Sequence, residues 1–284
     1  MKKLDFIGIG VQKAATSWLF QCLLEHPEIK VGKEKEVNFF NFKYHFGYHW
    51  YHNLFQFGDW KTGEFSTLYF YDKNVPERLY SYNPDIKLIL CLRNPIDRAY
   101  SQHQHEVRRG RVTGELLNFD LAVESNPTYI DQGYYASHLK SYLKYFKKEQ
   151  IFITFQEDIS SNPDKVLVDL YRFLNLDDKF IPSTINTKIN IARTYKSRRL
   201  DKTYRFIKGM IHKYANEENV EKIKKLGLHK LIEKFNAKEQ TPITTPPMTT
   251  DARTKLESIF ISEIKDLEKL TERNLSNWYR NINN

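Results

Sequence analysis

A turn near the N-terminus combines residue types that bind phosphate-like anions. An apolar, β-rich run from Phe6 to Val11 leads into Gln12, Lys13, Ala14, Ala15, Thr16 and Ser17, and an amphipathic helical pattern begins near Trp18. The first N–H groups of a helix lack intrahelical partners, and the positive end of the helix dipole lies beside them. Together with the Lys13 ammonium, these groups form a cradle suited to an anion.

A second segment supplies a guanidinium and a hydroxyl at an equivalent place. A buried-strand pattern from Lys87 to Leu92 ends at Arg93, and Ser101 follows eight residues after it in a helical pattern. In a parallel α/β sheet, ligands bind outside the carboxyl ends of the strands. The Arg93 guanidinium can grip a phosphate through two hydrogen bonds, and the Ser101 hydroxyl can add another.

The spacing of the turn differs from that of nucleoside-triphosphate sites. A Walker A loop reads G-x-x-x-x-G-K-[ST], whereas Lys13 precedes the small residues here and the glycine pattern is absent. Kinases and ATPases often place an acidic Mg²⁺ ligand where this chain has Arg93, so the pattern favours a bare phosphate, with a P-loop-type nucleotide kinase as the alternative. Because alanine is strained at positive φ, we also expect the turn to keep helical or extended conformations.

These two segments resemble the signatures of the sulfotransferase family that uses 3′-phosphoadenosine-5′-phosphosulfate (PAPS). The turn is similar to the family's 5′-phosphosulfate loop, and Arg93 with Ser101 is similar to its 3′-phosphate signature. Glu36-Val37-Asn38-Phe39-Phe40 resembles the E-x-x-F-F element of the heparan-sulfate-type (carbohydrate) branch. The resemblance extends over roughly residues 5–175.

The resemblance implies transfer of a sulfuryl group from PAPS, the co-substrate, to a hydroxyl or an amine of a carbohydrate, glycolipid or specialised metabolite. The implied donor-binding residues are Gln12, Lys13, Ala14, Ala15, Thr16, Ser17, Trp18, Arg93 and Ser101. Lys13 is implied to stabilise the charge on the leaving phosphate, and Glu36 carries over as the general base. Neither a metal nor a covalent intermediate is implied.

Several positions depart from the family pattern on the acceptor side. Asn38 stands where relatives commonly have His. The element that often reads G-E-K-[ST]-P has Phe65 in place of its Lys, and Glu64 becomes a second candidate base, an acceptor contact or a structural residue. Charges alternate from Lys33 to Glu36, so an exposed loop is the competing interpretation of Glu36.

Basic residues gather late in the chain, which has a net charge of +9. Helical patterns over 197–214 and 217–236 carry many of them, and Lys196, Ser197 and Arg198 are the candidates to complete the 3′-phosphate site. A basic helix face is most often simply solvated, but it also suggests a non-enzymatic polyanion-binding protein as an alternative function. We expect no nucleic acid partner; the expected partner is a small-molecule or glycan acceptor, and no oligomeric state follows from the sequence.

Alternating strand and helix patterns predict an α/β fold with a mainly parallel central sheet flanked by helices, a P-loop-like nucleotide-binding core with a helical C-terminal extension. Further patterns predict a strand at Ile151–Phe155 and helices at 132–147, 163–174 and 251–272. Residues 1–190 form the predicted PAPS-binding core and 191–284 the extension, with a Pro/Thr-rich linker or lid near 240–250, all in one sulfotransferase domain.

Composition limits the setting of the protein. The 284 residues are 40% hydrophobic and 14% aromatic, which is typical of a globular domain. Both cysteines lie in apolar patterns as reduced core residues do, and no apolar run approaches the ~18 residues of a membrane span, so we expect a cytoplasmic protein. His45, His49 and His52 have helical spacing but no H-E-x-x-H motif, and we expect no metal site.

Overall fold

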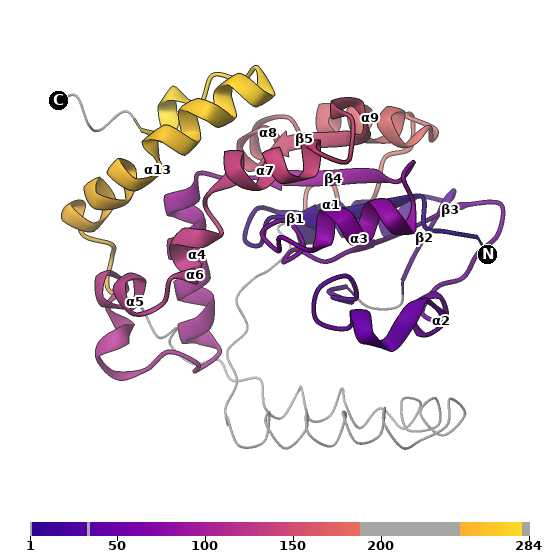
Figure 1. Cartoon of the computed structure of the whole chain (residues 1–284). Helices are drawn as coiled ribbons and strands as arrows, with labels where there is room; N and C mark the ends of the chain where they lie inside the picture. The colour runs from indigo at the N-terminus through magenta and orange to yellow at the C-terminus, as the bar shows by residue number, and fades with distance from the viewer. Residues whose placement is uncertain (1, 33–34, 188–244, 280–284) are drawn as a thin grey trace, which may run out of the picture. The chain divides into compact units, whose positions relative to one another are not determined.

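The computed structural model describes residues 2–32, 35–187 and 245–279. Five strands form one sheet in which every neighbouring pair is parallel, in the order β2-β3-β1-β4-β5 (Figure 1). The strands are β1 (Phe6–Gly10), β2 (Ile29–Val31), β3 (Lys61–Phe65), β4 (Lys87–Leu92) and β5 (Ile151–Phe155). The mainly parallel α/β sheet predicted from the sequence is confirmed.

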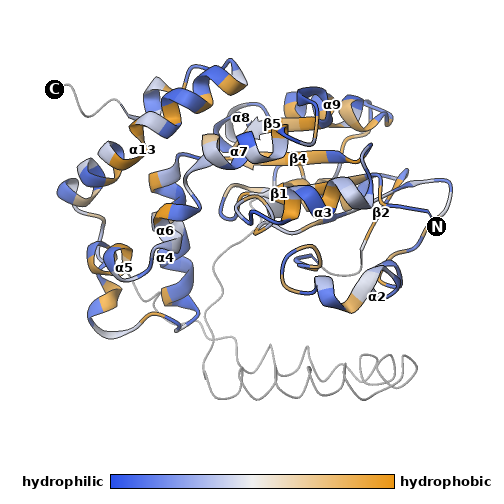
Figure 2. Ribbon diagram, in the orientation of Figure 1, coloured by the Kyte–Doolittle hydropathy of each residue, from blue (hydrophilic) through white to orange (hydrophobic). Residues whose placement is uncertain are grey.

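The central strands are buried along almost their whole length. All five residues of β1 and all but the first residue of β4 are buried, which explains their continuous apolar sequences. Figure 2 shows the hydrophobic colouring that runs along β4 and β5. Gly8 permits close packing within the sheet layer, because a Cβ at this position would lie 2.2 Å from the Phe65 ring.

Helices connect the strands and cover the sheet. They are α1 (Thr16–Glu25), α2 (Gly47–His52), α3 (Val75–Tyr82), α4 (Pro95–Arg108), α5 (Phe119–Ser125), α6 (Thr128–Asp131), α7 (Tyr135–Leu143), α8 (Gln156–Ser161), α9 (Pro163–Leu174) and α13 (Thr250–Thr271). The structure shows α9 with the predicted bounds and α13 within one residue of them. The helix predicted over 132–147 is shorter at both ends, because residues 132–133 form a turn after α6 and residues 144–146 form a turn and a bend after Leu143.

The chain divides into two compact units. The main unit comprises Met1–Gln102, Val123–Ile189 and Met248–Asn284, and the smaller one comprises His103–Ala122 and Asn190–Pro247. The domain boundary expected near residue 190 stays a prediction. The candidates Lys196, Ser197 and Arg198 and the basic helical patterns lie outside the described residues.

Within the main unit, the C-terminal helix α13 packs along α7. Phe260 is fully buried, and its ring lies 5.9 Å from that of Tyr134. The Lys140 ammonium contacts the Asp266 carboxylate at 2.6 Å on the exposed edge of this contact. Beyond α13, Arg273 donates two hydrogen bonds, of 2.6 and 2.7 Å, to the Asp158 carboxylate on α8. The segment that follows α13 is thus bound to α8 of the main unit.

Cys22 and Cys91 are both buried and free, as expected of reduced core residues. Across the described ranges, every helix is too short or too polar to cross a membrane.

Truncating Phe260 should show how much α13 contributes to the fold. Phe260→Ala is expected to lower the free energy of unfolding by about 3–5 kcal/mol, because a fully buried phenyl ring is lost and a cavity is left. Urea unfolding followed by circular dichroism measures this. Ser262→Ala, an exposed position on the same helix, is the matched control and should stay within about 0.5 kcal/mol of the wild type. A loss below 1 kcal/mol for Phe260→Ala would show that α13 is not part of the cooperative unit.

Candidate functional site

The turn between β1 and α1 adopts a backbone that the sequence did not suggest. Lys13 has φ 69° and Ala15 has φ 54°, both in the left-handed region. The expectation of a helical or extended turn is therefore wrong. The left-handed pair turns the chain sharply enough for α1 to begin at Thr16, directly beyond the carboxyl end of β1.

The start of α1 presents unused donors. The backbone N–H groups of Ala14, Thr16 and Ser17 donate to no other group among the described residues, whereas Trp18 and Leu19 donate to the Ala15 carbonyl. A row of such N–H groups at a helix N-terminus is the donor set that binds an anion. Trp18 differs from its neighbours, because its indole N–H also donates inside the chain, to Ile185 O at 3.0 Å.

Arg93 joins the two predicted signature segments. Its Nη1 donates to the Lys13 carbonyl at 3.1 Å, so the end of β4 and the turn after β1 meet at one edge of the sheet. The Tyr135 hydroxyl donates to Arg93 O at 3.0 Å and holds this residue from the side of α7. Ser101 lies half-buried on α4, the helix that follows Arg93.

A fully buried cation lies behind this edge. Arg98 on α4 donates to Gln102 Oε1 at 2.7 Å, to Gln132 Oε1 at 3.2 Å and to Tyr129 O at 2.6 Å. Burial lowers the pKa of its guanidinium. The Gln12 side chain donates to the same Gln132 oxygen, so Arg98 fixes Gln12 in the turn through one shared acceptor.

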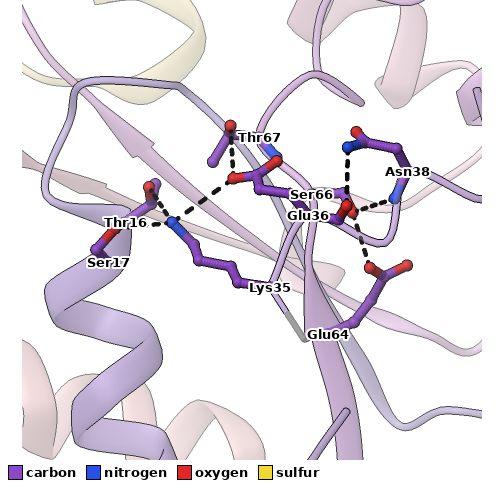
Figure 3. Close-up of polar contacts among 8 residues, drawn as sticks. All are labelled: Thr16, Ser17, Lys35, Glu36, Asn38, Glu64, Ser66 and Thr67. Atoms are coloured by element: carbon purple, nitrogen blue, oxygen red, sulfur yellow. Dashed lines mark hydrogen bonds and ion pairs between the residues drawn. The ribbon is translucent and has the colours of Figure 1, made fainter. Parts of the chain in front are cut away.

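Glu36 is the carboxylate that remains accessible. Its side chain is 36% exposed, and its two oxygens accept hydrogen bonds from the Thr67 N–H at 2.9 Å and the Thr67 hydroxyl at 3.0 Å (Figure 3). The Glu36 N–H donates to Phe65 O at 2.8 Å. Hydrogen bonds from the segment after β3 thus fix the orientation of the carboxylate, which stays partly exposed.

Lys35 is a candidate site residue that the sequence did not single out. Its ammonium donates to the hydroxyls of Thr16 at 3.2 Å and Ser17 at 3.0 Å, and it lies 3.6 Å from Glu36 Oε1 (Figure 3). Its side chain is only 20% exposed, and burial lowers the pKa of its ammonium although Glu36 partly offsets this. The alternating charges suggested an exposed loop. The one signal in the sequence that pointed to Lys35 as a site residue was its position directly before the candidate base Glu36.

Glu64 lies in the interior, directly beneath the loop that carries Glu36. It is fully buried, and its carboxylate accepts hydrogen bonds from the hydroxyls of Tyr51 at 2.7 Å, Tyr69 at 2.9 Å and Ser66 at 2.8 Å. Burial raises its pKa to about 7, against the effect of these three hydrogen bonds. Because Glu64 is fully buried and these hydroxyls occupy both oxygens, neither oxygen is accessible to an acceptor substrate.

The hydroxyls around Glu64 in turn hold the backbone of the neighbouring loop. Tyr69 accepts from the N–H groups of Phe39 at 2.7 Å and Phe40 at 3.2 Å, and Ser66 accepts from the Asn38 N–H at 2.9 Å. Asn38 has φ 55°, a conformation that Asn tolerates better than most residues, and its side-chain amide donates to Glu36 O at 2.9 Å. Asn38 therefore shapes the loop.

Comparison with known proteins places this geometry in a family. A family model described as a sulfotransferase domain matches residues 3–265. The chain is 30% identical to heparan sulfate glucosamine 3-O-sulfotransferase 5 of Mus musculus over 81% of this chain and 70% of that protein. The chain belongs to the sulfotransferase family.

A second sulfotransferase relative and a solved sulfotransferase structure are also similar to this chain. The sulfotransferase chain is 27% identical to the bifunctional heparan sulfate N-deacetylase/N-sulfotransferase 3 of Homo sapiens over 97% of its own length, and it spans only 31% of that protein. The crystal structure of a sulfotransferase from Alicyclobacillus acidocaldarius shares its fold, with a TM-score of 0.70, 24% identity and coverage of 98% and 99% of the two chains. This sulfotransferase is a transferase enzyme, and among its described residues no cluster of three metal-ligating side chains occurs.

The buried carboxyl of this sulfotransferase should make its stability depend on pH. Because the pKa of Glu64 in the folded protein is raised from 4.5 to about 7, its contribution to stability is fully present below pH 4.5 and is lost as the pH rises through 7. Glu64→Gln should remove a pH-dependent change on the order of 3 kcal/mol between pH 4.5 and 8. Urea unfolding at several pH values measures it.

The exposed Glu77 provides the matched control for this measurement. Glu77→Gln should leave the pH dependence of the wild type unchanged. If Glu64→Gln and wild type show parallel stability curves over the same range, the pKa of Glu64 is not raised.

Proposed function

We propose that this protein transfers the sulfuryl group of PAPS to a hydroxyl, or to an amine, of a carbohydrate, glycolipid or specialised metabolite. The observation that carries the donor assignment is the 3.1 Å hydrogen bond from Arg93 to the Lys13 carbonyl, which brings the two anion-binding segments together. Relatives named as heparan sulfate sulfotransferases support a carbohydrate acceptor. The two free, buried cysteines suit a reducing compartment, and we place the enzyme in the cytoplasm.

The donor set fits PAPS. Unused N–H groups of Ala14, Thr16 and Ser17, together with the Lys13 ammonium, suit the 5′-phosphosulfate, and the Arg93 guanidinium with the Ser101 hydroxyl suits the 3′-phosphate. Gln12, fixed through Gln132, and Ala15 shape the turn around the donor. The contacts of Trp18 are used inside the chain, so we assign Trp18 to the support of α1.

PAPS supplies an activated sulfuryl group whose leaving group is 3′,5′-adenosine bisphosphate. During transfer, the bond between sulfur and the bridging oxygen breaks, its electron pair stays on the phosphate oxygen, and a bond forms between sulfur and the acceptor oxygen or nitrogen. Lys13 stabilises the negative charge that develops on the leaving phosphate. The acceptor's proton moves to the Glu36 carboxylate.

Glu36 suits the role of base better than Glu64. The Glu36 carboxylate is 36% exposed and is aimed by two hydrogen bonds from Thr67. Glu64 is fully buried, and three hydroxyls occupy its oxygens. We therefore assign proton removal to Glu36 and the positioning of its loop to Glu64.

Binding of the donor product tests the donor half of this function. At a hundredfold excess over Kd, 3′,5′-adenosine bisphosphate should raise the melting temperature by about 5 °C or more, and ATP with Mg²⁺ should raise it much less. Arg93→Gln should weaken binding by about 10–100-fold in calorimetry, since charge-assisted hydrogen bonds are lost. Arg172→Gln, at an exposed arginine on α9, should bind as the wild type does. A preference for ATP with Mg²⁺ would favour a nucleotide kinase.

Removal of the proposed base tests the acceptor half. Glu36→Gln should keep the affinity for 3′,5′-adenosine bisphosphate and lower sulfuryl transfer by about 10²–10⁴-fold, because the amide cannot take the proton. Transfer of radiolabelled sulfate from PAPS to desulfated heparan sulfate measures this. The exposed-carboxylate control, Glu149→Gln, should transfer at the wild-type rate. Near-normal transfer by Glu36→Gln would rule out Glu36 as the base.

A further inference from the structure

Lys35 is a largely buried cation that reaches the anion cradle from a separate segment of the chain. Its Nζ lies 3.2 Å from Thr16 Oγ1, 3.0 Å from Ser17 Oγ and 3.6 Å from Glu36 Oε1 (Figure 3). Thr16 and Ser17 are the first two residues of α1, and their N–H groups are among the unused donors of the cradle. The ammonium therefore lies between the donor cradle and the proposed base.

The environment of Lys35 is unusual for a lysine that serves only solubility. Its side chain is 20% exposed, and its neighbours at the cradle are two neutral hydroxyls. Removing an ammonium from water is costly unless charged or strongly polar groups compensate. Within the described ranges, Glu36 is its one ion-pair partner, at a distance longer than a charge-assisted hydrogen bond.

The hydroxyl contacts leave this cation only partly compensated. A hydrogen bond to a neutral hydroxyl is weaker than one to an anionic oxygen. An anion that enters the cradle would give Lys35 a better acceptor than Thr16 or Ser17. Phe65, whose carbonyl accepts a hydrogen bond from the Glu36 N–H, has an apolar side chain that is 1% exposed and packs edge-on against Phe20, so it supplies no anionic partner for Lys35.

We propose, on the basis of the function proposed above, that Lys35 is a second catalytic cation, which binds the non-bridging oxygens of the sulfuryl group while it holds the Glu36 carboxylate beside the acceptor. Lys13 and Lys35 then have different roles in the transfer. Lys13 stabilises the phosphate that leaves, and Lys35 contacts the group that moves. No additional reactant or bond change is needed, since Lys35 keeps its protons throughout the transfer.

These different roles predict different effects of a Lys35 substitution on the binding of two ligands that differ only in the sulfuryl group. Lys35→Met should weaken PAPS binding by about tenfold or more in calorimetry, the loss of one charge-assisted hydrogen bond. Binding of 3′,5′-adenosine bisphosphate, which lacks the sulfuryl group, should change by less than about threefold. Transfer to desulfated heparan sulfate should fall by about 10²–10³-fold, the usual effect of deleting one preorganised donor.

Two further variants complete the experiment. Lys35→Arg keeps the charge and should recover at least a tenth of the wild-type transfer, whereas a purely structural lysine would give no such rescue at equal melting temperature. Lys73→Met, at an exposed lysine before α3, should bind and transfer as the wild type does. The proposal is overturned if Lys35→Met binds PAPS normally, or if it loses PAPS and the bisphosphate equally. Failure of the proposed function itself would be distinct, since the wild type would then bind neither ligand.

Discussion

The buried carboxylate of Glu64 is the interaction on which the geometry of the site depends. Three hydroxyls donate to it, and two of them, from Ser66 and Tyr69, accept hydrogen bonds from the N–H groups of residues 38–40. A carboxylate in the protein interior is costly, and its cost is offset only while these partners stay in place. The loop that carries Lys35 and Glu36 is therefore fastened to β3 through a chain of hydrogen bonds that is satisfied in one arrangement.

The parallel sheet determines which segments this loop can meet. In parallel strands the carboxyl ends share one edge, and β1, β3 and β4 are neighbours in the order of the sheet. The turn after β1 supplies the cradle, the end of β4 supplies Arg93, and the residues after β3 supply the Thr67 groups that aim Glu36. The proposed donor cradle and the proposed base thus come together because strands that are distant in the sequence are adjacent in space.

Local patterns in the sequence predicted part of this arrangement. The structure has β4, β5 and α9 at the predicted residues. Continuous apolar runs and helical periodicity are local sequence patterns that reflect burial directly, so these elements could be predicted. The three-residue strand β2 and the eight-residue helix α3, whose residues are of mixed polarity, lack such a pattern and were missed. Lys35 was missed for a different reason. Alternating charges are typical of exposed loops, and its burial comes from contacts with Thr16 and Ser17 that no local pattern encodes.

The backbone is strained at several residues of the proposed site. Among the described residues, six other than glycine have positive φ, namely Lys13, Ala15, Glu36, Asn38, Asn175 and Glu272. Asn175 and Glu272 cap the ends of α9 and α13, where a left-handed residue commonly terminates a helix. The other four lie in the cradle turn and the Glu36 loop, and each costs on the order of 1 kcal/mol. Helix termination does not explain them. Strain of this kind persists where surrounding contacts over-determine the backbone, as Arg93 does at Lys13 and Ser66 does at Asn38, and that is the expected signature of a preorganised site.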